Sequence, residues 1–267
     1  MFDQRAHLSF GTLLLVVLVS VPVSAEAVKG DETTTNEGTA YSLDDGAAAY
    51  REEHLRYQSG GQPARLVLYR CMDGTAFARK MVVERTGAAT PDFDFIDGRT
   101  GYREGVRSTA RGREVYWQKS TASVMKDKTL AIPANAVIDA GFDAMIRAQW
   151  TRLSTDAGIS AYFLLPSALR FFKVSIERVT TNPAAGAIHL RMKLDTWYGF
   201  AAPDTELDYR SSNQRLLRFK GIGTIRDARG RNQAVRIEFP GGLQGRQASA
   251  SEIAAAQRLP LTGRCGA

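Results

Sequence analysis

The chain has little cysteine and histidine, and no long hydrophobic run follows residue 21. Its two cysteines are too few for a disulfide-dense scaffold, and their spacing does not match a zinc site. The apolar stretch at 157–172 comes closest to a later membrane span, but Pro166 and Arg170 interrupt it. A bilayer-spanning helix needs about 20 apolar residues. We therefore expect no transmembrane segment after the N-terminal region, and no metal site.

The common catalytic motifs are also missing. The sequence has neither the Gly-x-Ser-x-Gly elbow of many serine hydrolases nor the His-Glu-x-x-His helix of zinc hydrolases. Gly221 and Gly223 lack the third glycine of a dinucleotide loop. Alanines follow Asp44-Asp45-Gly46 where a calcium loop needs further oxygen ligands. The prediction is a non-enzymatic protein with no catalytic residues and no cofactor.

The N-terminus has the three parts of a secretory signal peptide. Met1–His7 is short and polar, Leu8–Val21 is mainly apolar, and small residues follow at 23–25. Cleavage is expected after Ala25 or Ala27, and the protein is predicted to be periplasmic or secreted. The alternative is a retained membrane anchor, which the short apolar run disfavours.

Export bears on the two cysteines, because disulfides form and persist in oxidising compartments. We expect Cys71 and Cys265 to form a bond that ties the C-terminus back to an early strand. The alternative is one buried thiol and one exposed thiol. No cysteine lies near the predicted cleavage site, so the signal predicts a soluble envelope protein without a lipid anchor.

The formal net charge is +7, and arginine far outnumbers lysine. The positive charges are spread along the chain, and they do not alternate with aromatics as in RNA-binding segments. Export also argues against a nucleic-acid partner. Solvated strand faces account for the charge more simply.

Short runs of β-favouring residues alternate with turn residues from Thr39 onward. In the clearest one, Ile188, Leu190 and Met192 alternate with polar residues, as in a strand with one wet face. Strands are expected at 50–58, 64–71, 77–84, 92–96, 102–107, 114–119, 169–178, 188–194, 214–225 and 234–239. The predicted organisation is a signal peptide at 1–25, a flexible lead-in at 26–38, a single β-rich domain at 39–240 and a C-terminal tail at 241–267 with a short helix at 251–258.

One main helix is expected between the two groups of strands. Asn135 is a suitable N-cap, and apolar residues from Ile138 to Leu153 recur mostly at spacings of three and four. Hairpins on both sides of one packed helix predict a mainly β fold. We expect a curved antiparallel sheet or half-open barrel wrapped around that helix.

Two histidines remain after the predicted cleavage. His189 lies on the polar face of its strand, which predicts a solvated side chain. Strand alternation places Glu52, His54 and Arg56 on one face. Such a trio is more typical of a surface charge ladder than of an imidazole held for acid–base chemistry.

The segment 159–172 concentrates aromatic and aliphatic side chains after the helix. This composition is typical of the lining of a hydrophobic cavity, although it also suits a filled core. The predicted ligand-binding residues are Trp150, Tyr162, Phe163, Leu165, Phe171 and Phe172.

The order of elements over 39–240 resembles the periplasmic lipoprotein carriers of the LolA and LolB class. The segment from Leu216-Leu217-Arg218-Phe219 through Val235–Phe239 is also similar to other β-rich bacterial envelope proteins of unassigned function. This resemblance implies a half-open barrel whose concave face meets acyl chains. It transfers no binding residue, and the chain lacks the lipid-attachment cysteine of the anchored carrier.

The leading functional hypothesis is therefore a protein that binds a lipophilic ligand, with a lipid or a lipoprotein as its partner. The alternatives are an envelope interaction protein with a filled core and, third, a hydrolase. The sequence predicts no oligomeric state.

Overall fold

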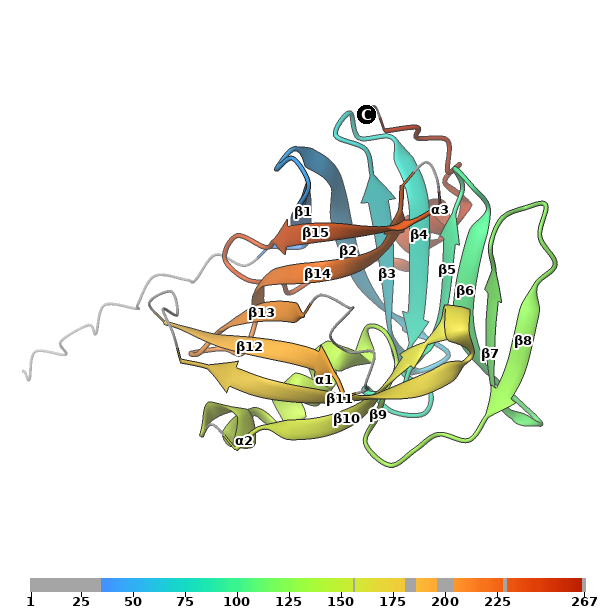
Figure 1. The fold of residues 1–267 in the computed structure, drawn as a ribbon. Helices are drawn as coiled ribbons and strands as arrows, with labels where there is room; N and C mark the ends of the chain where they lie inside the picture. The colour runs from blue at the N-terminus through green and yellow to red at the C-terminus, as the bar shows by residue number, and fades with distance from the viewer. Residues whose placement is uncertain (1–34, 156, 181–185, 196–203, 228–229, 266–267) are drawn as a thin grey trace, which may run out of the picture. The chain divides into compact units, whose positions relative to one another are not determined.

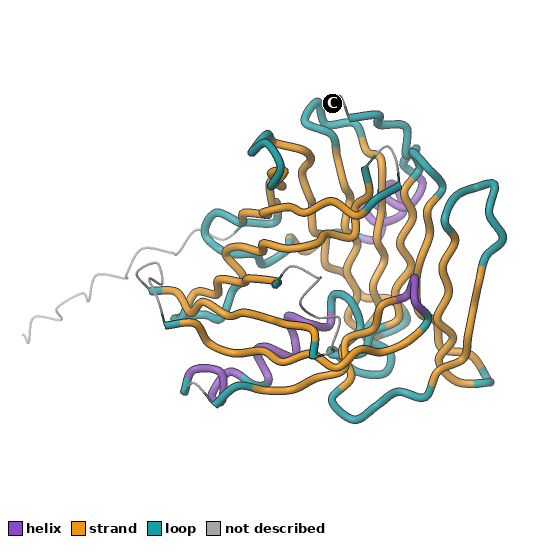
Figure 2. Tube along the Cα trace, viewed as in Figure 1, coloured by secondary structure: helices purple, strands orange, loops and turns teal. Residues whose placement is uncertain are grey.

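Sixteen β-strands of one sheet make up most of the described structure, a computed structural model that describes residues 35–155, 157–180, 186–195, 204–227 and 230–265. Thr33–Ala267 cluster as one compact unit. The predicted signal peptide at 1–25 and most of the predicted lead-in lie outside the described residues. The prediction of a mainly β, antiparallel fold is confirmed (Figures 1 and 2).

The first half of the sheet is a series of antiparallel neighbours. Its strands are β1 (Glu37–Ser42), β2 (Ala48–Ser59), β3 (Gln62–Arg70), β4 (Ala76–Val83), β5 (Asp92–Asp97), β6 (Tyr102–Thr109), β7 (Gly112–Gln118) and β8 (Lys126–Leu130).

The second half starts with one short strand and continues as antiparallel hairpins. Its strands are β9 (Ala136–Val137), β10 (Ile159–Leu165), β11 (Arg170–Val179), β12 (Ala187–Leu194), β13 (Thr205–Arg210), β14 (Leu216–Arg226), β15 (Asn232–Glu238) and β16 (Arg246–Gln247). The helices are α1 (Gly141–Ala148), α2 (Trp150–Ser154), α3 (Ala250–Arg258) and the 3-10 turn η1 (Pro166–Ala168).

The two halves of the sheet join where β1 pairs with β15, with Thr39 opposite Glu238. From that seam the order runs outward through β2 to β8 on one side and through β14 to β9 on the other. The two end strands do not pair, so the sheet is not closed. The turn η1 nevertheless contacts β6 and β7, which brings the hairpin of β10 and β11 against the first half.

Local sequence explains the regular parts of this topology. Gly60 and Gly61 both have positive φ, at 57° and 76°, and form the two-residue turn between β2 and β3. Such a turn needs left-handed backbone at both positions, which glycine adopts without steric penalty. In β12, Ile188 and Leu190 are buried while His189 and Arg191 face the other side. The alternation predicted from the sequence is confirmed there.

The predicted main helix is wrong in its extent and in its start. Asn135 has a φ of 59° and caps no helix, and Ala136–Val137 form β9, which pairs in parallel with β10. The edge of β10 offers hydrogen bonds, and the amide of Tyr162 donates to the carbonyl of Asn135 at 3.1 Å. Helical structure begins only at Gly141 and is interrupted at Gln149.

Three apolar clusters hold the unit together. On one face of the sheet, a cluster that includes Tyr69, Phe95 and Phe239 joins the two halves. Ile146 of α1 and Leu153 of α2 pack against β11, β12 and β13 in the second cluster. The described residues therefore hold three helices and no single helix enclosed by the sheet.

The third cluster lies on the opposite face of β2 and β3, where α3 covers Leu55, Leu66 and Leu68. The short helix expected at 251–258 is confirmed as α3. Ser249 caps it by accepting a hydrogen bond from the amide of Glu252, whose carboxylate accepts one from the Ser249 amide. This capping box satisfies amides that the first turn leaves without helical partners.

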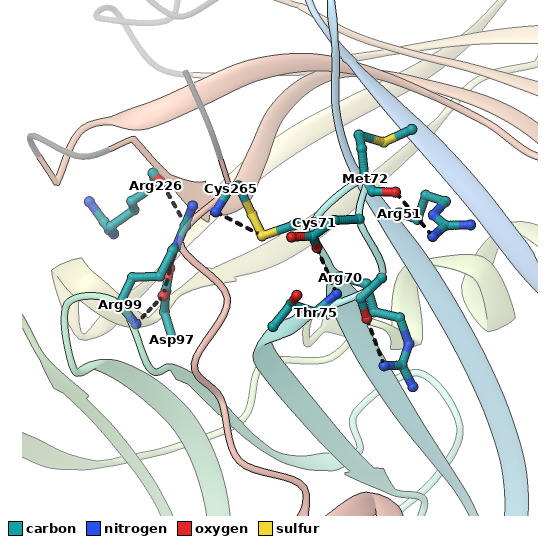
Figure 3. The surroundings of a disulfide bond; sticks show 11 residues. Arg51, Arg70, Cys71, Met72, Thr75, Asp97, Arg99, Arg226 and Cys265 are labelled. Atoms are coloured by element: carbon teal, nitrogen blue, oxygen red, sulfur yellow. Dashed lines mark hydrogen bonds and ion pairs between the residues drawn. A yellow bond between two sulfur atoms is a disulfide. The ribbon is translucent and has the colours of Figure 1, made fainter.

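The predicted Cys71–Cys265 pair is confirmed, since the two cysteines lie at disulfide distance with their Cα atoms 4.8 Å apart (Figure 3). The amide of Gly263 donates to the carbonyl of Ala76 at 2.8 Å, which seats the tail along the start of β4. Beside the bond, Arg99 pairs with Asp97 at 2.6 Å. Among the described residues, no helix is both long and apolar enough to cross a bilayer.

Candidate functional site: a two-walled cavity

A cavity of about 490 Å³ lies between the two halves of the sheet. One side, which we call the polar wall, comes from strands β2 to β6 and includes Glu52, His54, Arg65, Lys80, Tyr102 and Glu104. The opposite side, the apolar wall, comes from β10 to β14 and includes Phe163, Leu165, Phe172, Met192, Leu207 and Phe219. The cavity therefore has one polar side and one apolar side.

Sheet register places the charged groups of the polar wall in one row. His54 pairs with Val67, Val67 with Lys80, Lys80 with Phe95, and Phe95 with Glu104. Residues that pair across neighbouring strands project from the same face of a sheet. The polar side chains thus stand among apolar ones on the face that packs against the second half.

His54 and Glu52 form a buried hydrogen-bonded pair, with Nε2 of His54 3.1 Å from Oε2 of Glu52. The two residues are 6% and 8% exposed, so the interpretation as a surface charge ladder is wrong for both of them, whereas Arg56 is exposed. Burial lowers the pKa of His54 because an apolar environment disfavours the imidazolium. In a neutral ring, an Nε2 that donates to the Glu52 carboxylate leaves Nδ1 as an acceptor. That Nδ1 is buried and has no hydrogen-bond partner in the part of the chain that the structure describes.

Lys80 and Asp139 form a second buried pair, with Nζ 2.6 Å from Oδ1. The ammonium also lies 6.0 Å from the ring centroid of Phe93 and 5.8 Å from that of Phe95. Asp139 has a φ of 42° and lies just before α1. Aspartate is among the residues that tolerate this left-handed backbone, which lets the loop present a carboxylate to β4.

Tyr102 connects the buried carboxyl group of Glu104 to the second half of the sheet. Its hydroxyl donates to Oε2 of Glu104 at 2.5 Å and accepts from Arg226 of β14 at 3.0 Å. The Arg226 guanidinium also stacks on the Tyr102 ring, 4.1 Å from its centroid. Burial raises the pKa of Glu104, and the hydrogen bond from Tyr102 opposes that rise.

Of the six predicted ligand-binding residues, Phe163, Leu165 and Phe172 line the cavity. The other three are not among its lining residues. Trp150 packs edge-on against Tyr209, Tyr162 is exposed, and Phe171 packs against the cluster that joins the two halves. The segment was predicted as one patch, but it divides between two apolar clusters, with Phe163 packed against one and Phe171 against the other.

The place of His189 on a polar strand face predicts a solvated side chain, and this prediction is wrong. Its side chain is 13% exposed, and Nδ1 lies 2.5 Å from Oδ1 of Asp208, which also pairs with Arg218 at 2.6 Å. Cross-strand partners therefore cover the ring. His189 does not line the cavity. Among the described residues there is no group of three or more side chains suited to a metal ion.

Sequence reasoning missed most of the polar wall. Alternation identified the shared face of Glu52 and His54, but no local pattern connects Lys80 with Asp139 or Tyr102 with Arg226. These contacts join residues 59 and 124 positions apart. One signal in the sequence could have indicated the polar wall. Several strands carry charged residues at positions that share a face with aromatic residues.

Tyr69 lies on the polar wall and is fully enclosed, and burial raises its pKa well above the ordinary value. Unfolded tyrosine ionises near pH 10, so stability is present below that pH and is lost as the pH rises. Above pH 10, we expect the free energy of unfolding of Tyr69→Phe to fall less steeply than that of the wild type, by about 1.4 kcal/mol per pH unit. Urea denaturation of both proteins at about pH 9 and pH 11 measures the difference. If the free energy of unfolding falls equally between the two pH values in both proteins, Tyr69 ionises with an ordinary pKa.

Neither protein-family profiles, nor curated proteins, nor solved structures give a significant match to this chain.

Proposed function

We propose that this protein is a non-enzymatic binding protein that holds a lipophilic ligand in the cavity between the two halves of its sheet. The observation that carries the proposal is the cavity itself. Its volume of about 490 Å³ falls within the range of small-molecule sites. A filled interior would instead favour an interaction protein, and the cavity counts against that alternative.

The rim of the cavity supports access from solvent. Leu165, Leu194 and Ile222 line the cavity and are 41%, 38% and 39% exposed. Exposed large apolar side chains around a concave site are typical of ligand-binding grooves. They give an acyl or alkyl chain an entry that avoids the charged polar wall.

The cellular setting belongs to the same proposal. A signal peptide at 1–25, cleaved after Ala25 or Ala27, would send the protein to the periplasm or outside the cell. The Cys71–Cys265 pair is in keeping with an oxidising compartment. An unclosed sheet with a lipid-binding concave face is also what the resemblance to the LolA and LolB carriers implies. We propose a half-open barrel of that kind.

A matched pair of variants on β10 tests the proposal. Leu165 and Tyr162 are 41% and 40% exposed, but only Leu165 lines the cavity. Leu165→Asp is expected to weaken binding of methyl laurate at least about tenfold, because a carboxylate at the rim must be desolvated when the chain enters. Tyr162→Asp should leave binding unchanged. Native mass spectrometry with added methyl laurate measures the bound fraction.

Two results would contradict the proposal. One is a wild-type protein that binds no methyl laurate at concentrations below its solubility limit. The other is equal weakening by both substitutions, which would place the bound chain on the exposed side of β10 and outside the cavity.

A further inference from the structure

Two buried acceptors at the cavity have no partner among the described residues. Nδ1 of His54 and Oδ2 of Asp139 are each shielded from solvent and accept no hydrogen bond from that part of the chain. Both residues line the cavity. Buried polar atoms are nearly always hydrogen-bonded in folded proteins, so each such atom points to a missing partner. A ligand group that donates hydrogen bonds supplies it.

A hydrogen-bond donor on the polar wall also lacks an acceptor. Nε of Arg65 is buried without a partner, and among the described residues Arg65 forms no ion pair. Arg65 acts electrostatically on His54, as does Lys80. The polar wall therefore offers an acceptor at His54 and a donor at Arg65, and Asp139 of the loop before α1 adds a second acceptor beside it.

The charges of the cavity are mixed in sign, so a charged head group of either sign meets like charges there. A carboxylate head would lie near the carboxyl groups of Glu52, Glu104 and Asp139. An ammonium head would lie near the cations of Lys80 and Arg65. Like charges in a poorly solvated site repel strongly. A hydroxyl is neutral, and it both donates and accepts.

We infer that the polar wall binds the hydroxyl groups of a lipid with a polyol head, with Nδ1 of His54 as a principal acceptor. This inference rests on the proposed function, because the apolar wall must hold the chain. His54 and Lys80 stand two strands apart in one row, so roughly 10 Å separates their Cα atoms. A head with at least two hydroxyls, such as glycerol, would offer one hydroxyl to His54 and another to the Asp139 carboxylate that pairs with Lys80.

Three ligands with one chain and different heads test the inference on the wild-type protein. They are monolauroyl glycerol, lauric acid and methyl laurate, compared by isothermal titration calorimetry below the concentration at which each aggregates. We expect monolauroyl glycerol to bind about tenfold more tightly than methyl laurate, as one satisfied buried acceptor implies. We expect lauric acid to bind no better than methyl laurate.

A substitution then assigns the preference to His54. His54→Phe keeps a ring against Phe239, whose centroid lies 5.9 Å from that of His54. It should abolish the preference, so that monolauroyl glycerol and methyl laurate bind the variant equally. The matched control is His189→Phe, which also removes a histidine hydrogen-bonded to a carboxylate but lies outside the cavity. The control should keep the preference.

The outcomes separate the inference from the proposed function. Equal affinity for all three ligands would overturn the hydroxyl site and leave the lipophilic cavity standing. Tightest binding of lauric acid, unaffected by His54→Phe, would overturn it in favour of a carboxylate held by Arg65. Absence of binding by every ligand would overturn the proposed function itself. The wild-type series needs no variant, so it decides the question even if His54→Phe does not fold.

Discussion

Removal of the Cys71–Cys265 bond is expected to lower the free energy of unfolding by about 3–5 kcal/mol. The two cysteines are 194 positions apart, so the bond closes a loop that contains the strands from β4 to β16 and all three α-helices of the described part of the chain. In the chain-entropy account, a loop of this length restricts the unfolded chain by roughly 5 kcal/mol, and measured values are often smaller.

The folded state also depends on this bond, because it holds the tail that follows α3. Arg79 of β4 donates to the carbonyl of Leu259 at 3.4 Å, and the amide of Gly263 donates to the carbonyl of Ala76. Without the disulfide these contacts must position the tail alone. We therefore expect the region after α3 to exchange its amide hydrogens faster in the variant, while the sheet keeps its protection.

Urea denaturation of a Cys71→Ala/Cys265→Ala double variant measures the loss. Alanine is chosen over serine because Cys71 is only 2% exposed, and serine would bury a hydroxyl there. Reduction of the wild-type protein serves as a control, since it removes the bond and leaves both sulfurs in place. A double variant within about 1 kcal/mol of the wild type would contradict the chain-entropy account for this loop.

Much of the sheet could be predicted from the sequence because strand signals are local. Alternation of apolar and polar residues in β12, and glycine turns such as Gly60-Gly61, depend only on neighbouring residues. The strands β10 and β13 were not predicted. The first has apolar residues on both faces, and the second is short and mixed in character. Continuous apolar runs do not reveal their periodicity.

The polar wall shows what local patterns cannot reveal. Alternation places Glu52 and His54 on the same face, but which face is covered depends on how the sheet curls. In β2 and β3 both faces are buried, one by the second half of the sheet and the other by α3. Asp139 was predicted inside a helix, and its pairing with Lys80 follows from a loop that no propensity indicated. The disulfide was predictable because only two cysteines were present.

The pair of Lys80 and Asp139 gives the second large expected effect. Its side chains are 8% and 15% exposed, and the charges lie 2.6 Å apart. Lys80→Met keeps the apolar stem between Phe93 and Phe95 but leaves the carboxylate of Asp139 without its cation. Removal of one partner from a buried pair typically costs about 3–5 kcal/mol, and we expect a loss of that size in the free energy of unfolding.

Neutralising both partners should recover most of this loss. In the double variant Lys80→Met/Asp139→Asn no unpaired charge remains, and asparagine tolerates the left-handed backbone at position 139. We expect its stability to lie within about 1.5 kcal/mol of the wild type, because a buried ion pair contributes little beyond a neutral replacement of similar volume. Urea denaturation of the two single variants and the double variant gives the coupling energy.

The exposed pair of Lys173 and Asp195 is the matched control. The same two residue types lie 2.7 Å apart, but each side chain is 49% exposed. Solvent screens such pairs, so Lys173→Met should leave stability unchanged within error. If Lys80→Met were equally harmless, water would reach Asp139 freely and the polar wall would be hydrated. A large loss that the double variant recovers would instead mean that the wall holds its charges in a dry site. In such a site, an acceptor without a partner, such as Nδ1 of His54, costs the most free energy. A hydrogen bond from a ligand hydroxyl would then contribute the most to binding.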